Sequence, residues 1–295
     1  MMSRLARKSY LSSFLLAIAV LTTACHRGNK KDPEEGMPVQ ALYTKAHGEM
    51  EANNWSKAAT SFRHLVAQYP YGPYTAQAII EEAYANYKDA KYDEALVIID
   101  RFIRTYPTNP AIPYMYYLRG LVNSNRGTVF LRRVWSLDPS RRDLSLPYQA
   151  FNDFSVVVSR FPNSRYAADA RARMQQLQTI FSQHELDVAL YYLRRHAWIS
   201  AVQRASDLLQ TYPNSVFQYD AIAVLGEAYT HLGNKALADQ ARQRLQEKDP
   251  NHPWLTGHWP KYPWAISKLN PFASEKSAAT GQGDARIESK KSTSK

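Results

Sequence analysis

The sequence has only one cysteine, Cys25, and this scarcity excludes two classes of structure. A single cysteine can form neither an internal disulfide nor a metal site with several cysteine ligands. Glycine is also scarce, with 11 among 295 residues, as expected for a chain with little sheet or long loop. These two shortages favour a mainly helical chain without covalent cross-links.

Motifs that carry enzyme chemistry are missing as well. The sequence has no glycine-rich phosphate loop, no HExxH, no Cys/His cluster and no G-x-S-x-G. His252 and His258 lie near Asp249, but their spacing does not match known ligand sets. We therefore expect no enzymatic activity, no cofactor and no bound metal.

The net charge is +11, which can indicate nucleic acid or an anionic membrane surface as a partner. The basic residues are not gathered into one stretch with interleaved aromatic residues. Nucleic acid is therefore not expected as a partner.

One pattern of apolar residues occurs four times, each time followed by a proline. In the copy before Pro107 the apolar residues stand at offsets 0, 4, 7, 8 and 11, which is one face of an α-helix. Proline should end each helix, because it lacks an amide donor and clashes with the preceding turn. The four sets are Ala58, Phe62, Leu65, Val66 and Tyr69; Ala95, Ile99, Phe102, Ile103 and Tyr106; Ala150, Phe154, Val157, Val158 and Phe161; and Ala201, Ala205, Leu208, Leu209 and Tyr212.

Each patterned helix needs a partner helix to bury its apolar face. Small residues that let helices approach closely occur twelve positions earlier in three copies, at Ala46, Ala83 and Ala189. The pattern resembles the tetratricopeptide repeat, and the copy around Gly226 matches that signature best. The sequence therefore predicts an all-α fold, a right-handed α-solenoid of five tetratricopeptide-like helix pairs over residues 39–250.

The spacing of the terminal prolines locates two irregularities. The third pair is 18 residues longer, with Gly120 as its crossing residue, so an insertion is expected at about 126–147 between its helices. The fourth pair is 14 residues longer, and its first helix should be extended, because 166–195 contains no proline or glycine. Polar residues at Arg242 and Gln246 predict that the fifth pair caps the array.

The first 24 residues are interpreted as a signal peptide, with a basic start, an apolar run from Leu11 to Leu21 and small residues before Cys25. The run is shorter than the roughly 20 residues that span a bilayer. The segment resembles a bacterial lipobox, in which Cys25 would carry the lipid, palmitate included; the alternative is an ordinary secretory signal with a chance cysteine. Residues 25–38 are predicted to be a flexible tether, with Glu34 as one of its solvated charges.

The end of the chain differs from the repeats. Residues 251–273 are rich in Trp and Pro and are expected to pack on the last repeat as an irregular arm. Residues 274–295 contain almost nothing to bury and are predicted to be disordered.

Several strings resemble the BamD family, the ComL/YfiO-type lipoproteins of the outer-membrane β-barrel assembly machinery. They read YPYGPY at 69–74, IDRFIRTYPTNP at 99–110, RG at 119–120, FNDFSVVVSRFPNSRY at 151–166 and HAWISAVQRASDLLQTYP at 196–213. The resemblance implies a lipid-anchored scaffold on the periplasmic face of the cell outer membrane. By the same resemblance, His26 favours the outer membrane over the inner membrane.

The resemblance also implies partners. Members of the family bind the POTRA domains of the barrel subunit, BamA, through the C-terminal half, and nascent outer-membrane β-barrel proteins through the N-terminal half. Other Bam lipoproteins are expected partners too. The alternative function is that of a periplasmic repeat lipoprotein that binds peptidoglycan, or DNA during uptake.

Tyrosines in the first two repeats are the candidate groove for a substrate peptide. A tyrosine offers a large ring with one polar end and few rotatable bonds, which suits an extended peptide. The alternative is that these side chains only join the first repeat to the second. The candidates are Tyr43, Tyr69, Tyr71, Tyr74, Tyr84 and Tyr87.

Three arginines are candidates for a partner interface. Arg204 lies beside the core position Ala205, at the edge of an apolar face, and arginine suits a forked contact with a carboxylate. Arg132 and Arg133 lie in the insertion and could contact an acidic partner or anionic lipid. The alternatives are an exposed charge at Arg204 and a solvated loop at the insertion.

Overall fold

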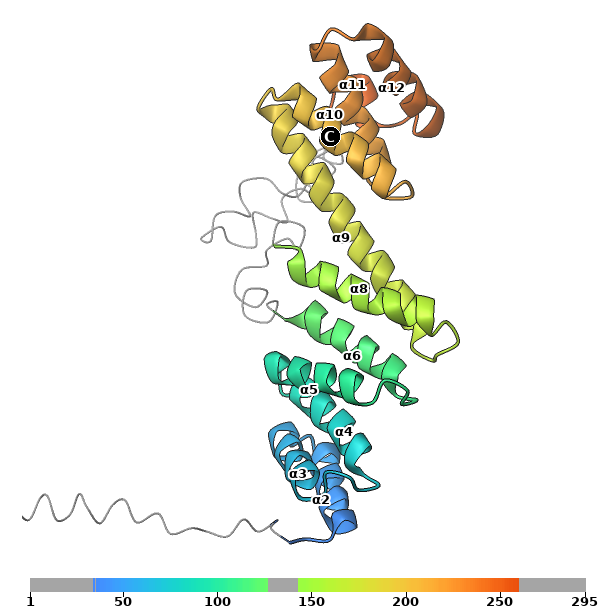
Figure 1. Cartoon of the computed structure of the whole chain (residues 1–295). Helices are drawn as coiled ribbons and strands as arrows, with labels where there is room; N and C mark the ends of the chain where they lie inside the picture. The colour runs from blue at the N-terminus through green and yellow to red at the C-terminus, as the bar shows by residue number, and fades with distance from the viewer. Residues whose placement is uncertain (1–33, 35, 127–142, 260–295) are drawn as a thin grey trace, which may run out of the picture. The chain divides into compact units, whose positions relative to one another are not determined.

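A computed structural model describes residues 34, 36–126 and 143–259, and every regular element among them is helical (Figure 1). This confirms the predicted all-α fold. The elements are α2 (Val39–Glu51), α3 (Trp55–Gln68), α4 (Thr75–Lys88), α5 (Tyr92–Thr105), α6 (Ile112–Asn125), α8 (Ser145–Arg160), α9 (Ala167–Arg194), α10 (Trp198–Thr211), α11 (Gln218–His231), α12 (Lys235–Lys248) and the 3-10 helix η2 (Pro253–Thr256).

The helices belong to two compact units that divide between Asp89 and Ala90. The first unit contains α2, α3 and α4, and the second contains α5 to α12 and η2. Within each unit every helix packs on the next one along the chain, and α9 also contacts α11. This is the packing of stacked helical hairpins, as the tetratricopeptide-like pattern predicts.

The repeated apolar pattern forms the core in all four copies. On α5, the first three positions, Ala95, Ile99 and Phe102, are completely buried. The last two, Ile103 and Tyr106, are only partly buried, and the same division holds in the other copies. The predicted face of each patterned helix is confirmed.

The prolines end the helices by constraining the residue before them. On α5 the capping residue Tyr106 has φ −124° and ψ 55°, outside the helical region, because Pro107 disfavours the helical conformation of its predecessor. Its N–H still donates to the carbonyl of Phe102, at 2.8 Å. Helices α3, α8, α10 and α12 end in the same way.

Small residues lie where paired helices cross, as predicted. Ala46 and Ala189 have no exposed surface. At Gly120 an added Cβ would lie 2.5 Å from Cε1 of Phe154, so α6 and α8 approach too closely for any side chain there. The Phe154 ring fills the space that a larger residue at position 120 would need.

Both irregular pairs have the predicted form. Helix α6 ends at Asn125 and α8 begins at Ser145, so the insertion lies between the two helices of the third pair. Helix α9 has 28 residues where α11 has 14, which accounts for all 14 extra residues of the fourth pair. Residues 127–142, with Arg132 and Arg133, lie outside the described part of the chain.

The start of the predicted arm packs on the last pair. Trp254 is 5% exposed, and its indole Nε1 donates to Glu227 Oε2 at 2.9 Å. Arg242, which replaces an apolar residue of the pattern, covers the Trp254 ring at 4.8 Å. The polar end of the repeat array at α12 therefore includes Arg242 stacked on Trp254. Residues 260–273 of the predicted arm and the tail from 274 to 295 lie outside the described part of the chain.

Among the described helices, none has both the length and the apolar character needed to cross a membrane.

Truncation of Phe102 tests the buried face of α5. Phe102→Ala should lower the free energy of unfolding by about 3–5 kcal/mol, because it removes a fully buried ring. Val97 lies on the same helix and is 68% exposed, so Val97→Ala should change it by about 0.5 kcal/mol or less. Chemical denaturation of both variants measures the difference; equal losses would contradict the assigned face.

Two glycines test the close helix crossing. Gly120→Ala should destabilise the chain by about 1–3 kcal/mol, because the new methyl group would overlap the Phe154 ring. Gly48, on α2, has no atom within 4 Å of an added Cβ. Gly48→Ala should therefore stabilise by about 0.5–1 kcal/mol through helix propensity alone. Thermal unfolding should give shifts of opposite sign, and two stabilising shifts would rule out the tight crossing.

Candidate functional site

Tyr43 and Tyr74 form the better-defined half of the candidate groove in the first unit. Their rings stack with centroids 4.8 Å apart. The Tyr43 hydroxyl donates to Glu81 Oε1 at 2.8 Å, and Gln77 Nε2 donates to the same oxygen at 2.7 Å. Burial, together with the Glu81 carboxylate, raises the pKa of Tyr43 well above its ordinary value, so its hydroxyl stays a donor.

Tyr84 and Tyr87 lie at the other end of α4. Tyr74 precedes the first residue of the helix and Tyr84 follows ten residues later, a rise of about 15 Å. Tyr84 packs edge-on against Trp55 at 5.9 Å, and Lys88 lies 5.2 Å from the Trp55 ring centre. The structure thus divides these four tyrosines into two aromatic groups, not one.

The remaining two candidates, at the α3–α4 corner, differ sharply in exposure. Tyr71 is 99% exposed, whereas the Tyr69 hydroxyl donates to the carbonyl of Met37 at 2.7 Å. Thr75 closes the corner: its hydroxyl donates to the Tyr69 carbonyl and accepts from the Gly72 N–H. Tyr69 therefore holds the chain before α2, and Tyr71 alone presents a free ring.

Glu34 is buried, so its interpretation as a solvated tether charge is wrong. It is 6% exposed, with its carboxylate bonded to Lys45 on α2 and to Ser61 Oγ at 2.8 Å and His64 Nδ1 at 2.6 Å on α3. Burial alone would raise the pKa of Glu34, but these three partners lower it below its ordinary value. The chain before α2 is thereby held against α3.

A partly buried ion network joins three helices of the second unit. Arg119 on α6 bonds through Nε to Asp153 on α8 at 2.8 Å and through Nη1 to Asp100 on α5 at 2.7 Å. Asn123 donates to the other Asp153 oxygen at 2.9 Å. Burial raises the pKa of Asp153 above its ordinary value, although the bonds from Arg119 and Asn123 act in the opposite direction. Arg119, within the RG string quoted above, therefore has a structural role between helices.

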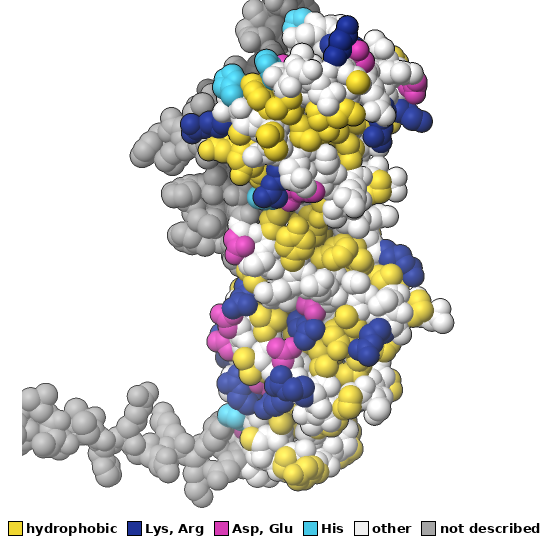
Figure 2. Space-filling model, turned by 45° about the horizontal axis from the view of Figure 1, so that its top comes forward, with side chains coloured by type: hydrophobic (Ala, Val, Ile, Leu, Met, Phe, Trp, Pro, Cys, Tyr) yellow, Lys and Arg dark blue, Asp and Glu magenta, His cyan; other side chains and the backbone are white. Residues whose placement is uncertain are grey.

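Arg204 has a partner within the chain. Its Nη1 lies 3.2 Å from Glu185 Oε2 on α9, and 43% of its side chain remains exposed. The Glu185 carboxylate thus orients the guanidinium, and the exposed part of the guanidinium could contact a carboxylate of another protein. On the face drawn in Figure 2, Lys and Arg side chains lie in small groups, several of them next to Asp and Glu.

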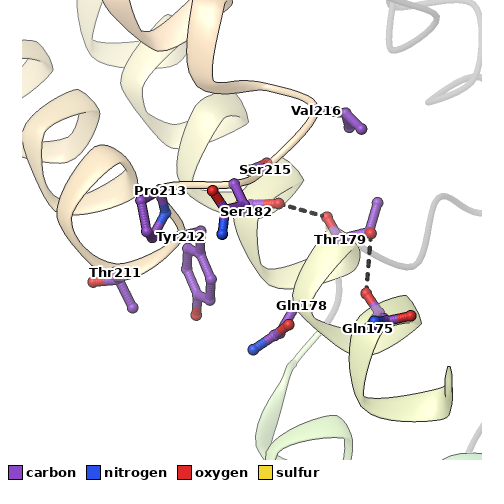
Figure 3. A pocket seen from close by; sticks show the side chains of 10 residues that line it. Gln175, Gln178, Thr179, Ser182, Thr211, Tyr212, Pro213, Ser215 and Val216 are labelled. Atoms are coloured by element: carbon purple, nitrogen blue, oxygen red, sulfur yellow. Dashed lines mark hydrogen bonds between the residues drawn. The ribbon is translucent and has the colours of Figure 1, made fainter. Parts of the chain in front are cut away.

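The lengthened helix α9 borders a hollow of about 400 Å³. Gln175, Gln178, Thr179 and Ser182 follow one face of α9, and the connection from Thr211 to Val216 forms the other wall (Figure 3). The lining contains neutral hydrogen-bonding groups and no charged side chain. It was not foreseen from the sequence, because its two walls are far apart along the chain.

Glu34, Thr75 and Glu81 were also missed as positioning residues. A Thr three residues after a glycine is a weak turn signal, and the two carboxylates carry no local pattern at all. Glu34 and Glu81 contact His64 and Tyr43, which lie 30 and 38 residues away, so only the tertiary packing identifies these contacts. Among the described residues, no three His, Cys, Asp or Glu side chains are grouped to hold a metal ion.

Comparison with known proteins identifies the family. Residues 35–245 match the model of the YfiO family, described as an outer membrane lipoprotein. The chain belongs to this family. Its relatives include "outer membrane protein assembly factor BamD" of Xylella fastidiosa strain 9a5c, 64% identical over 281 residues that cover 95% of this chain and 96% of that protein.

More distant relatives bear the same name. The protein of Neisseria meningitidis serogroup A is 36% identical over 85% of this chain and 95% of its own length. The protein of Haemophilus influenzae is 32% identical over 78% of this chain and 87% of its own length. Solved repeat structures resemble the chain only loosely: the TPR2AB domain of yeast Sti1 has 11% identity, covers 83% of this chain and 84% of that chain, and has a TM-score of 0.41.

The Glu34 cluster leads to a pH-dependent prediction. Glu34→Gln should destabilise the chain by about 1–3 kcal/mol at pH 7, because it weakens bonds to a charged acceptor. The folded pKa of Glu34 lies below its ordinary value. The stability difference from the parent should therefore be complete above about pH 4.5 and shrink as the pH falls through the folded pKa.

Glu51 provides the matched control for Glu34. Its side chain is 72% exposed and faces His47 at 3.3 Å. Glu51→Gln should lower the free energy of unfolding by about 0.5 kcal/mol or less. Urea denaturation at several pH values would contradict the assignment if both variants lost the same small amount.

Proposed function

We propose that this chain is an assembly factor for outer-membrane β-barrel proteins. The observation that carries the proposal is its 64% identity to a BamD assembly factor over almost the full length of both proteins. More distant relatives with the same name support it. The lipoprotein family to which the chain belongs supports its association with the outer membrane.

The chain works as a scaffold in this proposal and not as an enzyme. Its described buried polar groups, such as Arg119 with Asp153 and Glu34 with Ser61, join helices to one another. Stacked helical repeats offer extended surfaces for proteins to bind. Holding a partner and a client together needs such surfaces, and no covalent step.

Cys25 is the proposed anchor on the periplasmic face of the membrane. A lipidated Cys25 would hold residues 26–33 close to the bilayer and the first unit beyond them. The contacts of Glu34 and of the Met37 carbonyl support this arrangement, because they hold the chain to α3 and the residue after it before α2 begins. The tether in this proposal is therefore shorter than residues 25–38.

Nascent barrel strands are the proposed clients, and the Tyr43–Tyr74 group with Tyr71 is their proposed contact. A barrel strand alternates apolar with polar side chains and carries main-chain donors and acceptors along its edges. Exposed Tyr71 and the stacked pair offer rings to the apolar side chains, and the Tyr71 hydroxyl is open to the main-chain groups. Tyr84 and Tyr87 are proposed as a second contact, because they lie about 15 Å away along α4.

The barrel subunit BamA, with its POTRA domains, is the proposed partner of the second unit, and other Bam lipoproteins are further partners. Arg204 is the proposed contact residue, since Glu185 orients its guanidinium and part of it is exposed. Arg132 and Arg133, in the insertion, remain proposed contacts for an acidic partner or anionic lipid. No observation favours peptidoglycan or DNA binding over this function.

Photo-crosslinking tests the client site. A photoreactive residue at Tyr71 should crosslink to a peptide copying the C-terminal strand of a barrel protein, because that ring is exposed and stands three residues before Tyr74. Tyr74→Ala should weaken the crosslink several-fold. Tyr69→Phe, which removes only the bond to Met37, should leave it unchanged if circular dichroism shows the fold intact.

A photoreactive residue at Val97 is the positional control, because that side chain is also well exposed, at 68%, but lies on α5. Crosslinking at Val97 that equals crosslinking at Tyr71 would place the client elsewhere.

A charge swap tests the partner contact at Arg204. Arg204→Glu should lower co-purification with the barrel subunit about tenfold or more, as expected for loss of a charge-assisted hydrogen bond. The double variant Arg204→Glu with Glu185→Arg restores the internal pair but not the outward charge. Its co-purification should stay low; full recovery would show that Arg204 serves only the internal pair.

A further inference from the structure

Two neighbouring turns of the second unit expose apolar side chains. The first, residues 191–199, joins α9 to α10, and in it Tyr191 is 49% and Ile199 75% exposed. The second, residues 231–237, joins α11 to α12, and in it Leu232 is 42% and Leu237 37% exposed. We call these two stretches together the paired turns.

Ring contacts hold the paired turns side by side. Trp198 at the start of α10 stacks on His231 at the end of α11, with centroids 4.1 Å apart and planes 5° from parallel. His196 packs edge-on against the same Trp198 ring at 4.9 Å. Trp198 also packs against the buried core of α9, α10 and α11. The exposed residues therefore lie on two stretches that pack against each other and against the core.

The charge of the paired turns has one sign. They contain Arg194, Arg195 and Lys235, and neither stretch contains Asp or Glu. Arg195 lies 5.5 Å from the ring centre of Tyr191, so a cation sits directly beside an exposed aromatic residue. Glu227, which lies 3.3 Å from His231, also accepts a hydrogen bond from the Trp254 indole.

The arrangement matches the chemistry of a phospholipid headgroup region. Tyr and Trp favour the membrane–water interface, isolated aliphatic side chains insert shallowly, and Arg and Lys attract anionic headgroups. On the face drawn in Figure 2, hydrophobic side chains gather in the upper part of the picture, next to His and a group of Lys or Arg side chains.

We propose that the paired turns bind an anionic phospholipid surface, with Ile199 and Leu232 inserted among the headgroups and Arg195 and Lys235 contacting phosphates. This would be a membrane contact separate from any lipid on Cys25. A single weak membrane signal binds reversibly and becomes effective in combination with a second. The proposal does not depend on which protein the chain assembles with.

Vesicle flotation tests the proposal in the full chain with Cys25→Ser, which removes the lipid anchor. The protein should float with vesicles of phosphatidylethanolamine and phosphatidylglycerol, and less so with phosphatidylcholine alone or at high salt. Ile199→Asp with Leu232→Asp should lower the floated fraction at least fivefold. Val97→Asp, at a residue of similar exposure on α5 of the same unit, should leave it unchanged.

An environment-sensitive dye gives an independent measurement. In the Cys25→Ser background, Ile199→Cys supplies a unique thiol, since the chain has no other cysteine. A dye there should shift to the blue on addition of the anionic vesicles, and a dye at Val97→Cys should not. Equal flotation on both vesicle types, no effect of the aspartate pair, or a dye shift that requires an added protein partner would overturn the proposal.

Discussion

Close approach of paired helices is the constraint on which the rest of the structure depends. At Gly120 on α6 an added Cβ would lie 2.5 Å from Phe154 on the paired helix α8, and at Gly226 on α11 it would lie 2.4 Å from Trp254 on η2, which packs on the last pair. An aromatic ring occupies the space that each glycine leaves. Since a packed interior tolerates neither a void nor an overlap, the glycine and its ring must be present together.

The polar contacts take their positions from this packing. Arg119 can reach both Asp100 and Asp153 only because α5, α6 and α8 lie side by side. The stack of Trp198 on His231 likewise needs α10 and α11 in contact. Removing one partner of a buried charged network costs more than forming it gains, so these contacts strongly disfavour other registers between the helices.

Much of the fold could be predicted because its signals are local. The apolar offsets that end at Tyr106, and Pro107 after them, act within one helix. The length of α9 followed from the absence of proline and glycine over four extra turns. The burial of Glu34 could not be predicted, since Ser61 and His64 lie 27 and 30 residues away. The separation of Tyr74 from Tyr84 likewise depends on where α4 begins.

The central claim is that this chain is needed for the assembly of outer-membrane β-barrel proteins. The most direct test is depletion of the chain in its own host, followed by gel assays that separate folded from unfolded barrels by their heat-modified mobility. The account predicts that folded barrels decrease while other outer-membrane lipoproteins stay constant, and that a plasmid copy restores them. Unchanged folded barrels after complete depletion would contradict it.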